Sequence, residues 1–281
     1  MFKTVGVAGV GQMGSGIAHV FAQNGCRVIA YDPAPAQGGR ALASIAQNLE
    51  RQAKKGVVFD AGIEEILARI TVASSLEELG ACDLIVEAAT ESEALKLDLF
   101  RTLDGIAPDD AVLASNTSSI SITRIAAVTT RPDRVIGMHF MNPVPVMTLV
   151  EVIRGIATSE ETFAAVAEAV AFLGKEMATS KDYPGFIVNR ILIPMINEAA
   201  FALYEGIASA EDIDRGMKLG TNQPMGPLQL ADFIGLDTVL AICNVLYDGF
   251  KDPKYRPCPL LVQMVDAGYL GRKSGRGFHR Y

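Results

Sequence analysis

The sequence has few of the features that mark several large classes of protein. Its 25 Lys and Arg face 32 Asp and Glu, a formal net charge of −7, so it lacks the basic excess that neutralises nucleic-acid phosphates. The four cysteines, at positions 26, 82, 243 and 258, show neither C-x-x-C spacing nor a histidine at ligand spacing. We expect no nucleic acid partner, no metal, and thiols kept reduced.

Targeting and membrane segments are also missing from the pattern. The first residues, MFKTVGVAGVG, enter a strand without the basic region and long apolar run of a signal peptide. The longest apolar stretch, residues 185–206, contains Asn189, Arg190, Asn197 and Glu198, which are costly to bury in lipid. The sequence therefore predicts a soluble, cytoplasmic protein with no membrane partner.

The first half of the chain alternates short β-rich apolar runs with segments of helical spacing. Such near-continuous apolar strands, separated by helices, are typical of a parallel sheet covered on both faces. The predicted strands are 4–9, 27–32, 70–74, 84–89, 111–116, 134–140 and 148–153. A helix should follow them, begun by a capping box of Thr158 and Glu161 and ended at Gly174.

The pattern changes after Tyr183-Pro184-Gly185, which we interpret as a linker. From Phe186 onward there is helical spacing and almost no strand signal, with a capping pair at Ser209 and Asp212 and two apolar helices joined near Gly235. We predict an α/β domain over residues 1–183 and an all-helical C-terminal domain over residues 184–281.

A glycine pattern follows the first predicted strand. Gly9, Gly11 and Gly14 form G-x-G-x-x-G between a strand and an apolar-periodic helix, and a second strand ends at Asp32, eighteen residues after Gly14. This is the context of a Rossmann-type, doubly wound dinucleotide fold, in which backbone approaches a pyrophosphate and an acidic residue binds the ribose. We place a dinucleotide against the loop, which also carries Gln12 and Met13.

Two alternatives bear on this interpretation. Asp32 before Pro33 would also suit the N-terminus of a helix. A second glycine-rich segment, GRKSG at 271–275, lacks both the order of a Walker phosphate loop and a preceding strand, which argues against an ATPase.

Two titratable side chains interrupt apolar runs in the last predicted strands. If 134–140 and 148–153 pair as an antiparallel hairpin about Pro145, His139 and Glu151 stand opposite each other, within side-chain reach. Glu151 could then fix one imidazole nitrogen while the other acts as a base. The alternative is a histidine of the core with Glu151 as its structural partner.

Further candidates lie where such folds bind ligands. Ser118 follows another strand end, although it or Ser119 could instead cap the next helix. Asn189 begins the first helix of the second domain, where a cleft residue is expected, although it could cap that helix. Arg51, Lys54 and Lys55 form a basic cluster that could hold phosphates or be a solvated helix face.

Taken together, these motifs resemble the 3-hydroxyacyl-CoA dehydrogenase family, most closely its short bacterial 3-hydroxybutyryl-CoA dehydrogenases. The resemblance covers nearly the whole chain. Its carriers, in this order, are GVGQMGSGIA, IVEAATE, ASNTSS, GMHFMNPVPVM-LVEV, PGFIVNRILIPMINEA, GPLQLADFIGLD and GRKSGRGF.

The resemblance implies an NAD-dependent oxidoreductase that interconverts (S)-3-hydroxyacyl-CoA and 3-ketoacyl-CoA. It makes His139 the general acid/base, Glu151 its partner, and Ser118 and Asn189 binders of the substrate oxygen. It places near the cofactor Glu91, Lys96, Ser118, Asn142 and Lys273, and near the CoA phosphates Lys55, Arg51 and Asn48. It also implies a homodimer, and the second domain has more apolar helix surface than a small helical domain can bury. That surface could instead pack wholly on the first domain.

Three rivals remain at this stage. A β-hydroxyacid dehydrogenase would use a lysine on the first helix after the linker, but residues 182–217 contain none. A sugar-acid (gulonate-type) dehydrogenase would not need the basic cluster at 51–55. A dinucleotide-binding sensor or structural protein would have no use for His139 and Glu151.

Overall fold

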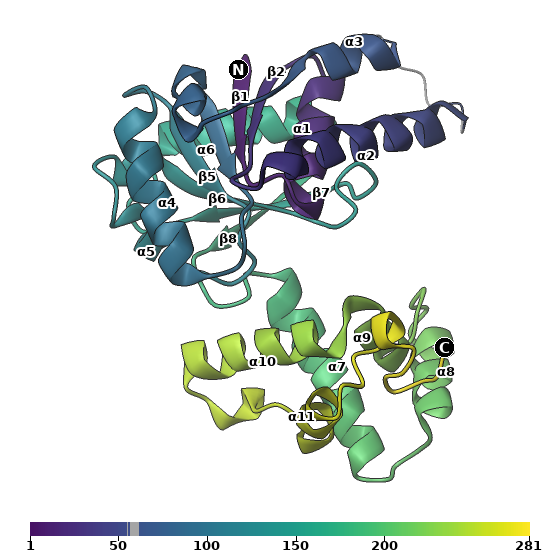
Figure 1. Ribbon diagram of the computed structural model, residues 1–281. Coiled ribbons are helices and arrows are strands. Elements are labelled where there is room, and N and C mark those ends of the chain that lie inside the picture. The colour runs from purple at the N-terminus through teal and green to yellow at the C-terminus, as the bar shows by residue number, and fades with distance from the viewer. Residues whose placement is uncertain (55, 57–61) are drawn as a thin grey trace. The chain divides into compact units, whose positions relative to one another are not determined.

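The computed structural model describes residues 1–54, 56 and 62–281, and these form two compact units, Met1–Tyr183 and Pro184–Tyr281 (Figure 1). Lys55 lies outside the described residues, so the structure does not place this candidate for the CoA phosphates. Each unit has its own apolar core.

The first unit is built on a mixed, mainly parallel sheet of eight strands in the order β3-β2-β1-β4-β5-β6-β7-β8. All neighbours run parallel except β6 and β7, which pair antiparallel. The order reverses between β1 and β4, which makes the carboxyl ends of these strands the expected ligand crevice. The strands are β1 (Thr4–Ala8), β2 (Arg27–Tyr31), β3 (Ile70–Val72), β4 (Leu84–Glu87), β5 (Val112–Ser115), β6 (Val135–Phe140), β7 (Leu149–Arg154) and β8 (Glu176–Lys181).

Helices cover both faces of this sheet, with α1 and α2 on one face and α4 and α5 on the other (Figure 1). Side chains of α1, α2 and α6 share one core with the central strands, which explains why these strands are apolar nearly throughout. The described helices of this unit are α1 (Gln12–Gln23), α2 (Pro35–Lys54), α3 (Ile63–Ala68), α4 (Glu93–Ile106), α5 (Ile122–Ala126) and α6 (Glu160–Phe172), with short 3₁₀ turns η1 (Leu76–Ala81) and η2 (Pro132–Arg134).

The sheet confirms the predicted Rossmann-type fold and all seven predicted strands, within one or two residues at each end. Strand β8 was not predicted, because most of its side chains are exposed and it carries no apolar alternation. The capping box at Thr158 and Glu161 was wrong: Ser159 caps α6, its hydroxyl accepting from the Thr162 amide at 3.1 Å. The Thr158 hydroxyl donates instead to the carbonyl of Val135.

Every regular element of the second unit, residues 184–281, is a helix, apart from isolated bridges in its last eleven residues. Ser209 caps α8 as predicted, and Gly235, at φ 103°, joins α9 to α10. The elements are α7 (Val188–Tyr204), α8 (Ala210–Gly220), α9 (Pro227–Ile234), α10 (Leu236–Phe250), η3 (Pro253–Tyr255), α11 (Pro259–Asp266) and η4 (Arg272–Ser274).

No single helix among the described residues is long and apolar enough to cross a membrane. Helices α9 and α10 meet that criterion only when taken together, and they bend by 100° at the break between them.

Candidate active site

The glycine loop between β1 and α1 is shaped by close approach of backbone to backbone. Gly9 has φ +91°, and a Cβ there would lie 2.8 Å from backbone atoms of Ala89. A Cβ at Gly14 would lie 1.8 Å from the carbonyl oxygen of Gly9, whereas one at Gly11 would meet nothing within 4 Å. The first and third glycines therefore permit the turn and the helix packing, and the second leaves backbone open to a ligand, as a pyrophosphate requires.

Asp32 follows β2 and is tied to this loop. Its carboxylate accepts the Val10 amide at 3.0 Å and the Ala34 amide at 3.0 Å. The bond from Ala34 lies in the turn into α2, and the bond from Val10 joins the carboxylate to the glycine loop; a role for Asp32 at the ribose stays a prediction. A cavity of about 400 Å³ opens here, lined by Gly9, Gly11, Tyr31, Asp32, Ala88, Ala89 and the apolar side chains of Leu76, Leu95 and Leu99.

The cavity has the chemistry of an adenosine site. Apolar walls suit a purine, a carboxylate at the end of β2 suits ribose hydroxyls, and the N-terminus of α1 offers amides to phosphate. These residues fit the dinucleotide that the sequence predicts, while Met13 packs partly buried against the core.

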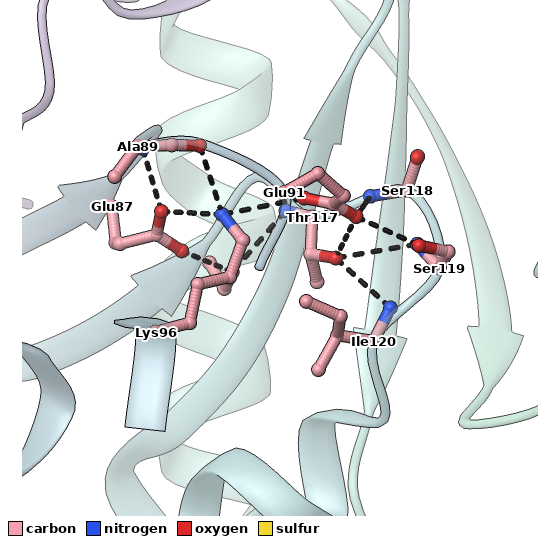
Figure 2. Close-up of polar contacts among 9 residues, drawn as sticks. Glu87, Ala89, Glu91, Lys96, Thr117, Ser118, Ser119 and Ile120 are labelled. Atoms are coloured by element: carbon pink, nitrogen blue, oxygen red, sulfur yellow. Dashed lines mark hydrogen bonds and ion pairs between the residues drawn. The ribbon is translucent and has the colours of Figure 1, made fainter. Parts of the chain in front are cut away.

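On the other side of the strand-order reversal, Glu91, Lys96 and Ser118 belong to one polar network (Figure 2). Glu91 accepts from the hydroxyl of Thr117, the amide of Ser118 at 3.0 Å and the hydroxyl of Ser119 at 2.9 Å. The Lys96 ammonium lies 3.3 Å from Glu91. The turn after β5, which carries Ser118, is therefore held by a residue of the segment after β4.

The network keeps Glu91 ionised. Burial raises the pKa of this carboxyl, but the Lys96 charge and the hydrogen bonds from Thr117, Ser119 and Ser118 outweigh it and lower the pKa below its ordinary value. An ionised carboxylate with this many donors fixes the turn strongly, because charge-assisted hydrogen bonds exceed neutral ones in strength.

His139 and Glu151 meet in the antiparallel hairpin of β6 and β7. The two residues are directly paired across the strands, as predicted, and imidazole Nδ1 lies 2.7 Å from a Glu151 carboxylate oxygen. His139 is 9 % exposed and Glu151 is fully buried. A carboxylate oxygen accepts hydrogen bonds, so this contact suits a ring that carries its hydrogen on Nδ1.

A second cavity, of about 450 Å³, lies between the glycine loop, one face of α2 and the turn after β6. Of the predicted residues, Gly11, Gln12, Asn142, Asn48 and Arg51 line it. The Gln12 amide donates to the Asn142 side-chain oxygen at 3.3 Å, and Arg51 donates to Asn48 at 3.4 Å. One cavity thus joins cofactor-side and substrate-side candidates that are far apart in the sequence.

The two remaining candidates belong to the helical unit. Asn189 is the second residue of α7 and is half-buried. Lys273, in η4, lies 2.6 Å from both carboxylate oxygens of Asp237. Among the described residues, no group of three or more His, Cys, Asp or Glu side chains is arranged to hold a metal ion.

Several site residues escaped the sequence analysis. Asn116 accepts the amide of Phe140 at 2.9 Å and so links the end of β5 to the residue after His139. Arg40 and Ser44 line the larger cavity at helical spacing from Asn48 and Arg51, a periodic signal that was present in the sequence. Glu87 ends the buried strand β4 and pairs with Lys96 at 2.5 Å; a charge inside an apolar run was the available signal.

Comparison with protein families covers both units. The family model described as "3-hydroxyacyl-CoA dehydrogenase, NAD binding domain" matches residues 4–183. That of "3-hydroxyacyl-CoA dehydrogenase, C-terminal domain" matches residues 185–281.

Individual relatives match along their full length. A 3-hydroxybutyryl-CoA dehydrogenase of Bradyrhizobium diazoefficiens is 56% identical over 281 residues, which cover 100% of this chain and 96% of the relative. One from Clostridioides difficile is 50% identical over 98% of each chain. The crystal structure of (S)-3-hydroxybutyryl-CoA dehydrogenase from Ralstonia eutropha superposes with a TM-score of 0.97 at 54% identity, covering 100% of this chain and 99% of that one.

Proposed function

The chain belongs to the 3-hydroxyacyl-CoA dehydrogenase family, and we propose that His139 is the acid/base with which it interconverts (S)-3-hydroxyacyl-CoA and 3-ketoacyl-CoA. NAD is its cofactor. The substrate pair is 3-hydroxybutyryl-CoA and acetoacetyl-CoA, by similarity to relatives of that name at 50–56% identity.

The observation that carries the assignment is the contact between His139 and Glu151. His139 is held by a buried carboxylate at 2.7 Å and stands near the carboxyl end of β6. This is the β4–β6 half of the sheet, which faces the nicotinamide in this fold. A histidine with only a structural role would not need to stand at that edge.

Bound NAD supplies the hydride acceptor. This chain's residues manage the proton and the orientation. In oxidation, His139 takes the proton of the 3-hydroxyl; in reduction, the protonated imidazole returns it to the 3-keto oxygen. Glu151 keeps the ring oriented and stabilises its charged form. We also propose that Ser118 and Asn189 donate hydrogen bonds to the substrate oxygen.

The larger cavity supports a CoA ester as the substrate. One end of its lining carries Gln12 and Asn142, and along α2 it carries Asn48 and Arg51 together with Arg40. Guanidinium groups are suited to phosphates and to the carbonyls of a pantetheine arm. We propose that Arg51 and Lys54, at the basic end of α2, and Lys55, which follows them in the sequence, bind the CoA phosphates.

The proposal includes a homodimer formed through the helical unit. That unit exposes large apolar side chains: Ile191 is 66 % exposed, Ile207 71 %, Leu219 75 % and Phe233 61 %. A second copy would cover such a surface. A cytoplasmic location also remains proposed; the four cysteines are free and buried, which suits a reducing compartment.

The test is NADH oxidation with acetoacetyl-CoA beside free acetoacetate and a keto sugar acid, in wild type and in His139→Gln. We expect turnover with acetoacetyl-CoA only, and its loss in the variant. Preference for the sugar acid would identify a gulonate-type dehydrogenase. Binding of NADH without turnover of any of the three would indicate a sensor.

A further inference from the structure

Glu87, the last residue of β4, has a fully buried carboxylate whose two oxygens both accept strong hydrogen bonds. One oxygen accepts the Lys96 ammonium at 2.5 Å and the Ala89 amide at 2.6 Å. The other accepts the Ser115 hydroxyl at 2.6 Å. Figure 2 shows the Glu87 carboxylate beside Ala89, with Lys96 and Glu91 lying between it and the turn that carries Ser118.

These bonds reach the Ser118 turn by two routes. Along the first, Lys96 lies between Glu87 and Glu91, and Glu91 accepts the Ser118 amide. Along the second, Ser115, held by Glu87, accepts the Thr117 amide at 3.2 Å. A change at Glu87 therefore alters both supports of the turn.

The buried Glu87–Lys96 pair is better suited to fixing the positions of its neighbours than to stabilising the core. Two charges lose their hydration on burial, and an apolar pair of the same volume would often serve a core equally well. An ionised carboxylate, by contrast, fixes the direction of every donor around it. The Lys96 ammonium donates hydrogen bonds to Glu87 and, at 3.1 Å, to the Ala89 carbonyl, and it forms an ion pair with Glu91.

We infer that Glu87 is a positioning residue for the reaction, which sets the place of Ser118 through Lys96, Glu91 and Ser115. The inference rests on the proposed function in one respect, that Ser118 binds the substrate oxygen. Glu87 itself is fully buried, so it acts on the turn only through these hydrogen bonds.

A double-mutant cycle tests the inference. Ser118→Ala should lower kcat/KM for acetoacetyl-CoA by roughly 10- to 100-fold, the worth of a hydrogen bond to a reacting oxygen. Glu87→Gln keeps the shape but removes the charge, and should cost about tenfold in the wild-type background. In the Ser118→Ala background it should cost less than about twofold, because residues that act through one another are not additive.

The outcomes separate this inference from the function it rests on. If Ser118→Ala impairs the enzyme and Glu87→Gln costs the same factor in both backgrounds, Glu87 does not act through Ser118 and the inference is overturned. If Ser118→Ala leaves kcat/KM normal, the role proposed for Ser118 is wrong, and the inference falls with it.

Two further variants guard against a misfolded Glu87→Gln protein. Ser115→Ala removes one of the two routes without leaving a buried charge unpaired, and should also cost less in the Ser118→Ala background than alone. Asp104→Asn is the matched control: Asp104 is a buried carboxylate on the same helix as Lys96, paired with Arg131 at 2.7 Å and bonded to Thr130. It should lower thermal stability and leave kcat/KM per folded molecule unchanged.

Discussion

His139 and Glu151 stand directly opposite each other in the antiparallel pair of β6 and β7, with imidazole Nδ1 2.7 Å from a carboxylate oxygen. The same register makes His139 one of the last residues of its strand, whereas Glu151 lies inside β7 and is fully buried. The carboxylate is therefore fully hidden from solvent and the largely buried ring keeps a small exposed fraction of 9 %, which suits an orienting residue behind an acid/base.

Substitution of this pair should affect turnover more than folding. General acid–base catalysis contributes roughly 10²- to 10⁴-fold, so His139→Gln should lose at least about 100-fold in kcat while still binding NADH. Glu151→Gln should lose as much or less, because it removes orientation and charge but leaves the base. The losses should not add in the double variant. Steady-state kinetics and NADH fluorescence titration measure both quantities.

A histidine with a purely structural role predicts a different result. His139→Gln would then show a lower melting temperature with near-normal kcat per folded molecule. Circular dichroism beside active-site titration distinguishes the two cases.

Asp32 should make the enzyme selective for NAD over NADP. Its carboxylate is anchored by the Val10 and Ala34 amides and lines the smaller cavity. If the ribose binds there as proposed, a 2′-phosphate would meet a like charge at a cost of several kcal/mol. We expect kcat/KM to be at least about 100-fold higher with NADH than with NADPH. Asp32→Asn should narrow that ratio. Equal or better use of NADPH by the wild type would contradict this assignment.

Sequence reasoning succeeded where a local pattern determines backbone geometry. The glycine turn and the His139–Glu151 register follow from turn chemistry and strand periodicity, and the structure shows close backbone approach at Gly9 and Gly14 and the pairing of His139 with Glu151. Strand β8 was missed because it is an edge strand with mostly exposed side chains, so it has no apolar alternation to read.

The contacts that fix the site could not be predicted in the same way. The hydrogen bonds between Asn116 and Phe140 and between Glu87 and Ser115 join residues 24 and 28 positions apart in the sequence. Which residues meet over such separations depends on the order of the strands in the sheet. Arg40 is a different case, because its helical spacing to Ser44 and Asn48 places all three on one face of α2. The sequence does not show that the turn carrying Asn142 lies opposite this face and closes the cavity. From the sequence alone, the face therefore could not be distinguished from a solvent-exposed one.

The cavity along α2 should recognise the CoA part of the substrate. Arg51 is exposed on the last turn of α2 and lines this cavity. Arg51→Ala should raise KM for acetoacetyl-CoA several-fold, more at low salt than at high salt, because exposed charge interactions are screened within about 10 Å at 0.1 M salt. KM for NADH should hardly change. Lys55→Ala should act in the same direction.

Arg101→Ala is a suitable control for this effect, since Arg101 is exposed on α4 and pairs with Asp98 away from that cavity. If Arg51→Ala and Arg101→Ala give the wild-type KM at low ionic strength, the basic face of α2 is only solvated.

The chain should sediment as a dimer of about 60 kDa, twice its 29.9 kDa. Ile207 and Leu219 are more than two thirds exposed in the helical unit, and a single lysine at a covered apolar position should weaken the association. We expect Leu219→Lys or Ile207→Lys to shift the species toward 30 kDa at micromolar concentration. A wild-type protein found only as a 30-kDa species would exclude the proposed dimer.

His19 should make the first unit sensitive to acid. It lies on α1 with its side chain fully buried. Burial lowers its pKa from 6.5 to about 4; a contact with the Gln23 side chain raises the pKa in part, and the Lys175 charge lowers it slightly further. Between these two pKa values the unfolded chain binds a proton that the folded chain does not. Stability is therefore fully present above about pH 6.5 and falls as the pH drops toward 4.

The size of this effect follows from the same two values. At pH 5 the loss should be about 2 kcal/mol relative to pH 7.5, since each pKa unit is worth about 1.4 kcal/mol. His19→Met, which has no titrating group, should lose correspondingly less between these pH values in urea unfolding. Glu91 and the other carboxyl groups are the same in both proteins, so their titration does not mask the difference. An identical pH dependence in His19→Met and wild type would show that His19 is not the group responsible.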